Sequence, residues 1–288
     1  MHGHMASHAL MDPAAFVKRQ LVQRVRAVFN DPARGEAPVI PSTNALFAPD
    51  TPIRMVHSDV ISMMVGGVAA LLLQMLHPHA LRGVLDHSNF RADMHGRLRR
   101  TARFIAMTTY GERTQAEQAI ARVNAIHTRV KGTLPDGTPY SATDPRVLAW
   151  VHVTGAASFL DAYLRYVRPE MPGAEQDEYF RQFAVIARML GADPVPETRA
   201  EAAAIMQAMR PELAGGADVR EIARVVMENR AQGILVPVQA VISNAAVDML
   251  PPYARTLLEL DPPALAGIPA KVAARSLSET MRWAFKRT

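Results

Sequence analysis

The sequence predicts an all-α fold in a single domain. Hydrophobic residues make up 49% of the 288 residues, and they recur with the three- and four-residue spacing of amphipathic helices, while the strict alternation of strands is rare. The length suits one large domain, and no linker is long enough to separate two. We therefore expect residues 13–288 to form one globular multi-helix domain, preceded by a tag-like or disordered start at residues 1–12.

Composition limits the chemistry that this chain can carry out. The absence of cysteine excludes a disulfide framework, iron–sulfur clusters and covalently attached haem, so any haem would be non-covalent. The formal charge of +5 comes from scattered arginines, without zinc-finger spacing or an aromatic-interleaved basic patch, so we expect no nucleic-acid partner. We expect a cytoplasmic protein, and the basic segment 271–286 favours peripheral contact with an anionic membrane surface.

The first third of the chain predicts a helix over residues 13–29, an irregular segment and a strongly apolar helix. Residues 30–52 contain five prolines and could wrap around the domain or around the partner in a homodimer. Residues 60–76 carry no charge but are shorter than the roughly 20 residues of a membrane span, so a buried central helix is favoured over insertion into one leaflet. Gly66 and Gly67 would let another backbone or a flat ligand approach closely.

A basic helix is expected next, from an N-cap at Ser88 to Tyr110. Along the flank of its apolar face lie Arg97, Thr101 and Phe104, with Arg100 one step further round. The pattern fits either a solvated basic face with snorkelling arginines or a buried cationic cluster that needs an anionic partner. The histidines before and inside this helix lack the spacing of a zinc site, and we interpret them as loop and helix-end residues.

The helix expected over residues 114–132 contains the histidine on which the functional interpretation depends. Thr114 and Glu117 fit a capping box, and Gly132 fits a stop just past the end. His127 lies within the apolar stripe of this helix. It could be a core histidine bonded to a neighbour or the axial ligand of a buried metal or haem, and spacing alone leaves both readings open.

The remaining chain predicts a small hairpin and further helices. The hairpin is expected around Pro135-Asp136-Gly137, within the turn-rich residues 131–144. Asp161 falls among apolar residues and would need a partner if buried. Helices are expected over residues 145–167, 175–190, 197–209, 218–228, 233–250 with a break at Pro237, and 270–285.

Four motifs between Val56 and Tyr166 resemble those of a known family. They are LLLQMLHPHALRGVLDHSNF, GRLRRTARFIAMTTYG, VNAIHTRVKG and LAWVHVTGAASFLDAY, in this order. Together they are similar to the haem-containing oxygenase family that includes rubber oxygenase (latex clearing protein) and the fungal ER-bound mycophenolate-pathway oxygenase. The resemblance implies an all-α fold around a buried, non-covalent haem b.

The resemblance also implies roles for individual residues. His127 would be the iron ligand, with its other ring nitrogen donating to a carbonyl or carboxylate. Arg97, Arg100 and Thr101 would be the catalytic residues on the other side of the haem, and we assign Arg97 and Phe104 with His127 to cofactor contact. Rubber oxygenases carry a lysine where this chain has Arg100, and they use a glutamate upstream that this chain lacks, which argues against polyisoprene cleavage by that route.

The leading hypothesis is therefore a haem b-dependent oxygenase. It would act with O₂ or peroxide on a small apolar substrate, such as an unsaturated lipid or isoprenoid-like compound. The alternatives are a non-enzymatic helical protein that binds lipid or a membrane surface, and a haem sensor or carrier without turnover.

Overall fold

The computed structural model describes residues 37–90, 93–228, 236–260 and 270–285. Within these ranges the chain forms twelve α-helices and one two-stranded sheet, which confirms the predicted all-α class. The helix predicted over residues 13–29, the residues from there to 36, and the tag-like start all lie outside the described residues.

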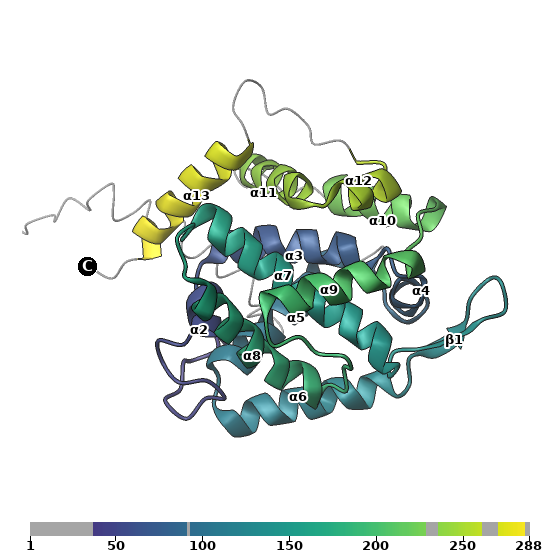
Figure 1. Ribbon diagram of the computed structural model, residues 1–288, viewed down its shortest axis with the longest axis horizontal. Helices are drawn as coiled ribbons and strands as arrows, with labels where there is room; N and C mark the ends of the chain where they lie inside the picture. The colour runs from purple at the N-terminus through teal and green to yellow at the C-terminus, as the bar shows by residue number, and fades with distance from the viewer. Residues whose placement is uncertain (1–36, 91–92, 229–235, 261–269, 286–288) are drawn as a thin grey trace, which may run out of the picture.

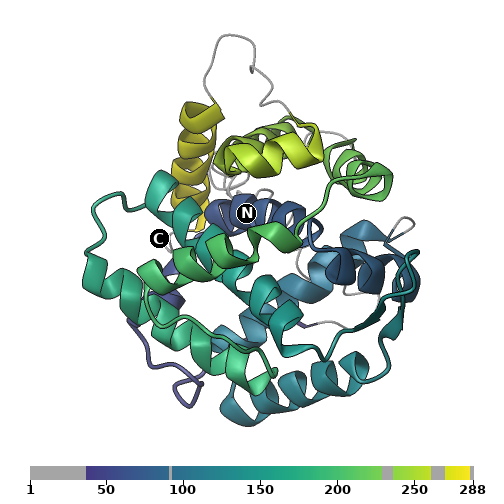
Figure 2. The same cartoon turned by 45° about the vertical axis from the view of Figure 1, so that its right-hand side comes forward.

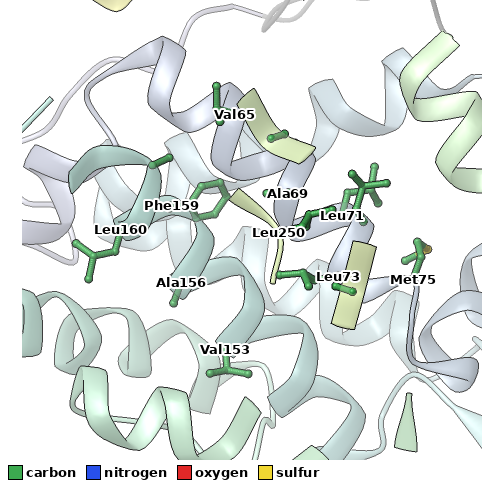
Figure 3. Close-up of a cluster of buried hydrophobic side chains, with 14 of the residues drawn as sticks. Val65, Ala69, Leu71, Leu73, Met75, Val153, Ala156, Phe159, Leu160 and Leu250 are labelled. Carbon is green, nitrogen blue, oxygen red and sulfur yellow. The ribbon is translucent and has the colours of Figure 1, made fainter. Parts of the chain in front are cut away.

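Two apolar helices form the centre of the molecule. Helix α3 (Val60–Gln74) lies across α7 (Pro145–Tyr166), and each contributes a row of fully buried aliphatic side chains to their contact (Figures 1 and 3). A Cβ added at Gly66 would lie 2.7 Å from the carbonyl oxygen of Ser158. The close approach that Gly66 permits is therefore to the backbone of α7, and the prediction of a buried central helix is confirmed.

Further helices cover α3 and α7 on both sides. On the side of α3 lie α10 (Ala217–Glu228), α11 (Val236–Met249), α12 (Pro252–Leu258) and α13 (Ala270–Phe285), grouped at the top of Figure 1. On the side of α7 lie α8 (Gly173–Met189) and α9 (Arg199–Met209), and the short α2 (Pro52–Val56) packs against α8. Figure 2 shows the same two groups from a second direction.

Side-chain hydrogen bonds connect these layers. Asp59 caps α3 by accepting from the Ser62 amide at 2.9 Å, and Ser278 of α13 donates to the same carboxylate at 3.0–3.1 Å. Asp161 finds the partner that the sequence required, since Arg199 donates to it at 2.8 Å.

One described helix has the length and apolar composition to cross a membrane. This helix is α7, and 72% of its apolar window is buried inside the protein. Such burial is typical of the central helix of a domain. Helix α3 and the following α4 (Pro78–His87) would reach such a length only together, and they are bent by 103°. Helix α4 itself was missed by the sequence analysis, which interpreted its histidines as loop and helix-end residues.

The site residues predicted from the sequence lie on α5 (Met94–Tyr110) and α6 (Arg113–His127), which pack against each other. The hairpin of β1 (Lys131–Thr133) and β2 (Pro139–Ser141) follows α6, with Gly132 opposite Tyr140 in antiparallel register. This confirms the predicted hairpin and places it directly after His127.

The predicted end of α5 at Tyr110 is confirmed, whereas its predicted start and both predicted ends of α6 were wrong. Helix α5 is capped by Asp93, which accepts from the Gly96 amide at 2.9 Å, while Ser88 closes α4 by donating to the Val84 carbonyl at 2.6 Å. Helix α6 is capped by Glu112, two residues before the expected Thr114, and it ends at His127 instead of continuing to Gly132.

Candidate functional site

Helix α6 ends on the histidine singled out by the sequence. The Glu112 carboxylate accepts from the Thr114 amide at 2.8 Å and from the Gln115 amide at 3.3 Å, which satisfies two of the unpaired donors at the start of the helix. The inward face continues through Ala116 and Ile120, which are fully buried, to the half-buried His127. The apolar stripe therefore carries the imidazole to the inner side of the helix end.

The imidazole of His127 has no hydrogen-bond partner among the described residues. Its Nδ1 atom is buried and unpaired, so the predicted carbonyl or carboxylate acceptor is not found there. Burial, and secondarily the positive charge of Arg97, lower the pKa of His127 below its ordinary value of 6.5. The ring is therefore neutral at pH 7, and a neutral imidazole retains the lone pair that binds a metal.

Arg97 lies near His127 and lacks a carboxylate partner in the described part of the chain. Burial lowers the pKa of Arg97, and the charge of Arg100 lowers it further. The acidic side chain one turn earlier, Asp93, pairs instead with Arg100 at 3.2 Å. Because no described carboxylate neutralises it, this half-buried guanidinium is available to an anionic or electron-rich group that enters beside His127.

The other predicted residues of α5 divide between solvent and core. The side chain of Arg100 is 54% exposed. Thr101 is also exposed, and its hydroxyl donates a hydrogen bond to the Arg97 carbonyl oxygen at 3.1 Å. Phe104 is half-buried and packs against the main core. The structure thus brings Arg97 and His127 together, leaves Arg100 and Thr101 on the solvent side of α5, and places Phe104 at the inner face.

His152 is a residue near this site that sequence reasoning did not assign. It lies on α7, its ring meets Phe183 edge-on at 6.1 Å between centroids, and it lines a small recess that is otherwise apolar. Burial, with a smaller effect from His127, lowers the pKa of His152 to about 4. A second neutral imidazole therefore lies within electrostatic range of the first. The sequence signal that could have identified His152 is an imidazole within an apolar helix, which is the signal that identified His127.

His57, a buried histidine that the sequence analysis also left unassigned, follows α2 and contacts the end of α5 far from Arg97. His57 shares hydrogen bonds with Thr109 at 2.8 Å and with Tyr179 at 3.4 Å, and burial lowers its pKa to about 3. Because both of its ring nitrogens are bonded to protein, His57 is a satisfied core histidine. This is the environment that His127 lacks.

The single imidazole of His127 fits one kind of metal-containing group. In the described residues no three or more His, Asp or Glu side chains gather to hold a bare ion. A haem brings four nitrogen donors of its own and needs one protein imidazole. His127, neutral and without a described hydrogen-bond partner, fits that requirement, with Arg97 nearby and without a described carboxylate partner.

Comparison with known proteins identifies the family of the chain. Residues 54–283 match the family model described as "ER-bound oxygenase mpaB/B'/Rubber oxygenase, catalytic domain". No curated protein and no solved structure matches the chain. The match covers most of the 288 residues and includes all the helices of the site. The chain therefore belongs to the family of ER-bound oxygenases and rubber oxygenases and is an oxygenase enzyme.

Proposed function

We propose that this oxygenase depends on a non-covalent haem b held by His127 and acts on a small apolar substrate. The observation that carries the proposal is the neutral imidazole of His127 at the end of α6, whose Nδ1 has no partner among the described residues. The Arg97 guanidinium is close enough to contribute, after burial, to the lowered pKa of His127. Family membership supports the oxygenase reaction, and the donor set supports the type of cofactor.

In this proposal the residues of the chain have separate tasks. His127 would hold the iron, and the burial that lowers its pKa keeps the imidazole in the neutral form that can bind a metal. Arg97 would supply fixed positive charge to an electron-rich group bound beside His127, and it has no competing carboxylate among the described residues. The haem, when bound, would supply the O₂ or peroxide chemistry.

The remaining residues form the edge and wall of the site. Phe104, packed on the inner side of α5, would contact the haem. Arg100 and Thr101 lie on the exposed side, so we propose that they act at the rim. The residues around His152 are apolar, which suits a small apolar substrate such as an unsaturated lipid or isoprenoid-like compound.

The test of the cofactor is the absorption spectrum of the purified protein with and without dithionite. We expect a Soret band that is lost in His127→Ala. His79→Ala is the matched control, because His79 is also half-buried with an unpaired Nδ1 but packs against His77 on α4. Full haem retention in His127→Ala would remove His127 from the role of ligand.

The test of the reaction is oxygen uptake in the presence of candidate unsaturated lipids. Uptake that depends on both haem and lipid is the expected result. A haem-loaded protein that consumes no oxygen with any of them would instead be a sensor or carrier.

We also propose two associations of the whole molecule, a homodimer and a peripheral contact with anionic membranes. Co-sedimentation with anionic but not neutral liposomes would support the membrane contact. The membrane contact cannot use α3, since this helix is covered by α7, α11 and α13. A size-exclusion mass of twice the chain would support the dimer.

A further inference from the structure

A group of polar contacts lies directly after His127, where the hairpin meets α4. The Tyr140 hydroxyl donates to Asp86 Oδ2 at 2.6 Å. His87 Nε2 lies 3.1 Å from the Lys131 carbonyl oxygen and 3.2 Å from the Tyr140 hydroxyl. Because a carbonyl oxygen can only accept, His87 carries its proton on Nε2 and donates from it. The three side chains Asp86, His87 and Tyr140 are called the hairpin anchor below.

The tyrosine of the hairpin anchor requires glycine on the facing strand. A Cβ added at Gly132 would lie 2.7–2.9 Å from the hydroxyl and ring atoms of Tyr140, closer than real Cβ atoms come. The ring of Tyr140 therefore rests on the backbone of Gly132, and it is only 4% exposed. This contact with Tyr140, rather than a role in ending α6, explains why residue 132 is glycine.

The hairpin anchor is connected to His127 by a short, hydrogen-bonded stretch of backbone. The Val130 amide donates to the His127 carbonyl at 3.1 Å, and the Ala142 amide donates to the Val130 carbonyl at 2.9 Å. Arg82 in turn holds Asp86 at 2.6 Å and reaches Asp218 of α10 at 3.3 Å. The exit of the chain from His127 is thus tied through the hairpin and α4 to a helix on the other side of the molecule.

The protonation states suit a permanent contact. Burial and the hydrogen bond to Asp86 raise the pKa of Tyr140 to about 12, so the phenol remains a donor over the whole range in which the protein would function. A short hydrogen bond to a carboxylate is also stronger than one between neutral groups.

We propose that Tyr140, Asp86 and His87 are positioning residues, which set the direction of the His127 imidazole by fixing the backbone that leaves α6. This inference rests on the proposed function of His127 as the haem ligand. His127 is the last residue of α6, where helices fray, and no hydrogen bond from a described residue holds its ring. The hairpin anchor supplies the constraint that the ring lacks.

The experiment compares two matched substitutions, Tyr140→Phe and Tyr110→Phe. Each removes one hydroxyl and keeps its ring, and the Tyr110 hydroxyl donates to the Arg54 carbonyl at 2.8 Å, at the other end of α5 from Arg97. For Tyr140→Phe we expect roughly fivefold weaker haem binding, the equivalent of one hydrogen bond, and a changed spectrum of the ligated iron. Tyr110→Phe should lower thermal stability by a similar amount while leaving haem affinity and spectrum unchanged.

A second pair of variants tests the acceptor. Asp86→Asn keeps an oxygen that can accept from Tyr140 and should retain most of the haem affinity, whereas Asp86→Ala should behave like Tyr140→Phe. Amide hydrogen exchange over residues 128–132 of haem-free protein should be faster in Tyr140→Phe and Asp86→Ala than in wild type. This readout also serves if either variant binds haem too weakly to measure.

The outcomes separate this inference from the proposed function. A wild-type protein that binds no haem would overturn both. If the wild type binds haem through His127 but Tyr140→Phe matches it in affinity, spectrum and exchange, the positioning role is wrong while the function stands. An equal loss of haem affinity in Tyr110→Phe would likewise show a general effect of stability.

Discussion

At the scale of single residues, two arginines of α5 three positions apart have different environments. Arg97 is half-buried without a carboxylate partner among the described residues, whereas Arg100 is 54% exposed and paired with Asp93 at 3.2 Å. An exposed, paired arginine contributes little to the field inside a protein because water and its partner screen it. The two residues were assigned together by sequence motif, but the structure separates them.

This difference predicts unequal effects of Arg97→Ala and Arg100→Ala on a bound haem. Removing the charge of Arg97 should lower the midpoint reduction potential by about 40 mV, which for one electron corresponds to about 1 kcal/mol. Arg100→Ala should change the potential by less than about a third of that. Spectroelectrochemical titration measures both, and equal shifts would show that Arg100 approaches the haem as closely as Arg97.

Single-residue predictions from the sequence succeeded where the signal was local. Helical periodicity placed His127 on the inner face of α6, and the structure confirms that placement. Periodicity did not reveal that the neighbouring apolar residue Ile126 is 45% exposed. Nor did it distinguish His57, which is bonded at both nitrogens, from His127, which is not, because hydrogen-bond partners more than fifty residues away are invisible to local pattern.

At the scale of elements, the crossing of α3 and α7 depends on one glycine of a pair. A Cβ at Gly66 would lie 2.7 Å from the Ser158 carbonyl oxygen and 2.9 Å from the Phe159 Cα. A Cβ at Gly67 would meet only the end of the Phe159 ring, at an ordinary 3.7 Å. From the sequence alone, Gly66 and Gly67 were expected to play the same role.

We therefore predict opposite effects for Gly66→Ala and Gly67→Ala. Gly66→Ala forces two backbones apart and should lower the free energy of unfolding by roughly 1–3 kcal/mol. Gly67→Ala should be neutral or stabilising by up to about 1 kcal/mol, since alanine is the better helix former. Denaturant unfolding measures the free energy of unfolding of each variant. A Gly66→Ala protein as stable as wild type would contradict the close crossing of α3 and α7.

Element boundaries were predicted less well than the elements themselves. Helix α4 was missed because the sequence H-P-H was interpreted as an end, whereas Pro78 occupies the first turn of a helix capped by His77. At α5 and α6 several residues could cap, and tertiary contacts select among them. Glu112, for example, also accepts from the Asn44 side chain at 2.8 Å.

At the scale of the whole molecule, buried neutral histidines couple stability to pH. Burial lowers the pKa of His57 to about 3 and that of His152 to about 4, while both have ordinary values near 6.5 when unfolded. Below pH 6.5 the unfolded chain therefore binds more protons than the folded one. Their contribution to stability is fully present above pH 6.5 and is lost as the pH falls toward the folded values.

The expected result is a free energy of unfolding that falls on acidification, by up to about 1.4 kcal/mol per pH unit for each such histidine. His57→Gln should be less stable than wild type at pH 7 but should lose stability less steeply between pH 6 and pH 5. Denaturant unfolding at several pH values measures the slopes. Parallel slopes for the two proteins would show that His57 is protonated in the folded state.

The central claim, that His127 binds the iron, is tested most directly by resonance Raman spectroscopy of the reduced, haem-loaded protein. We predict an iron–imidazole stretching band that shifts when histidine is labelled with nitrogen-15, disappears in His127→Ala and persists in His79→Ala. An unchanged band in His127→Ala would place the iron on another residue and contradict the account.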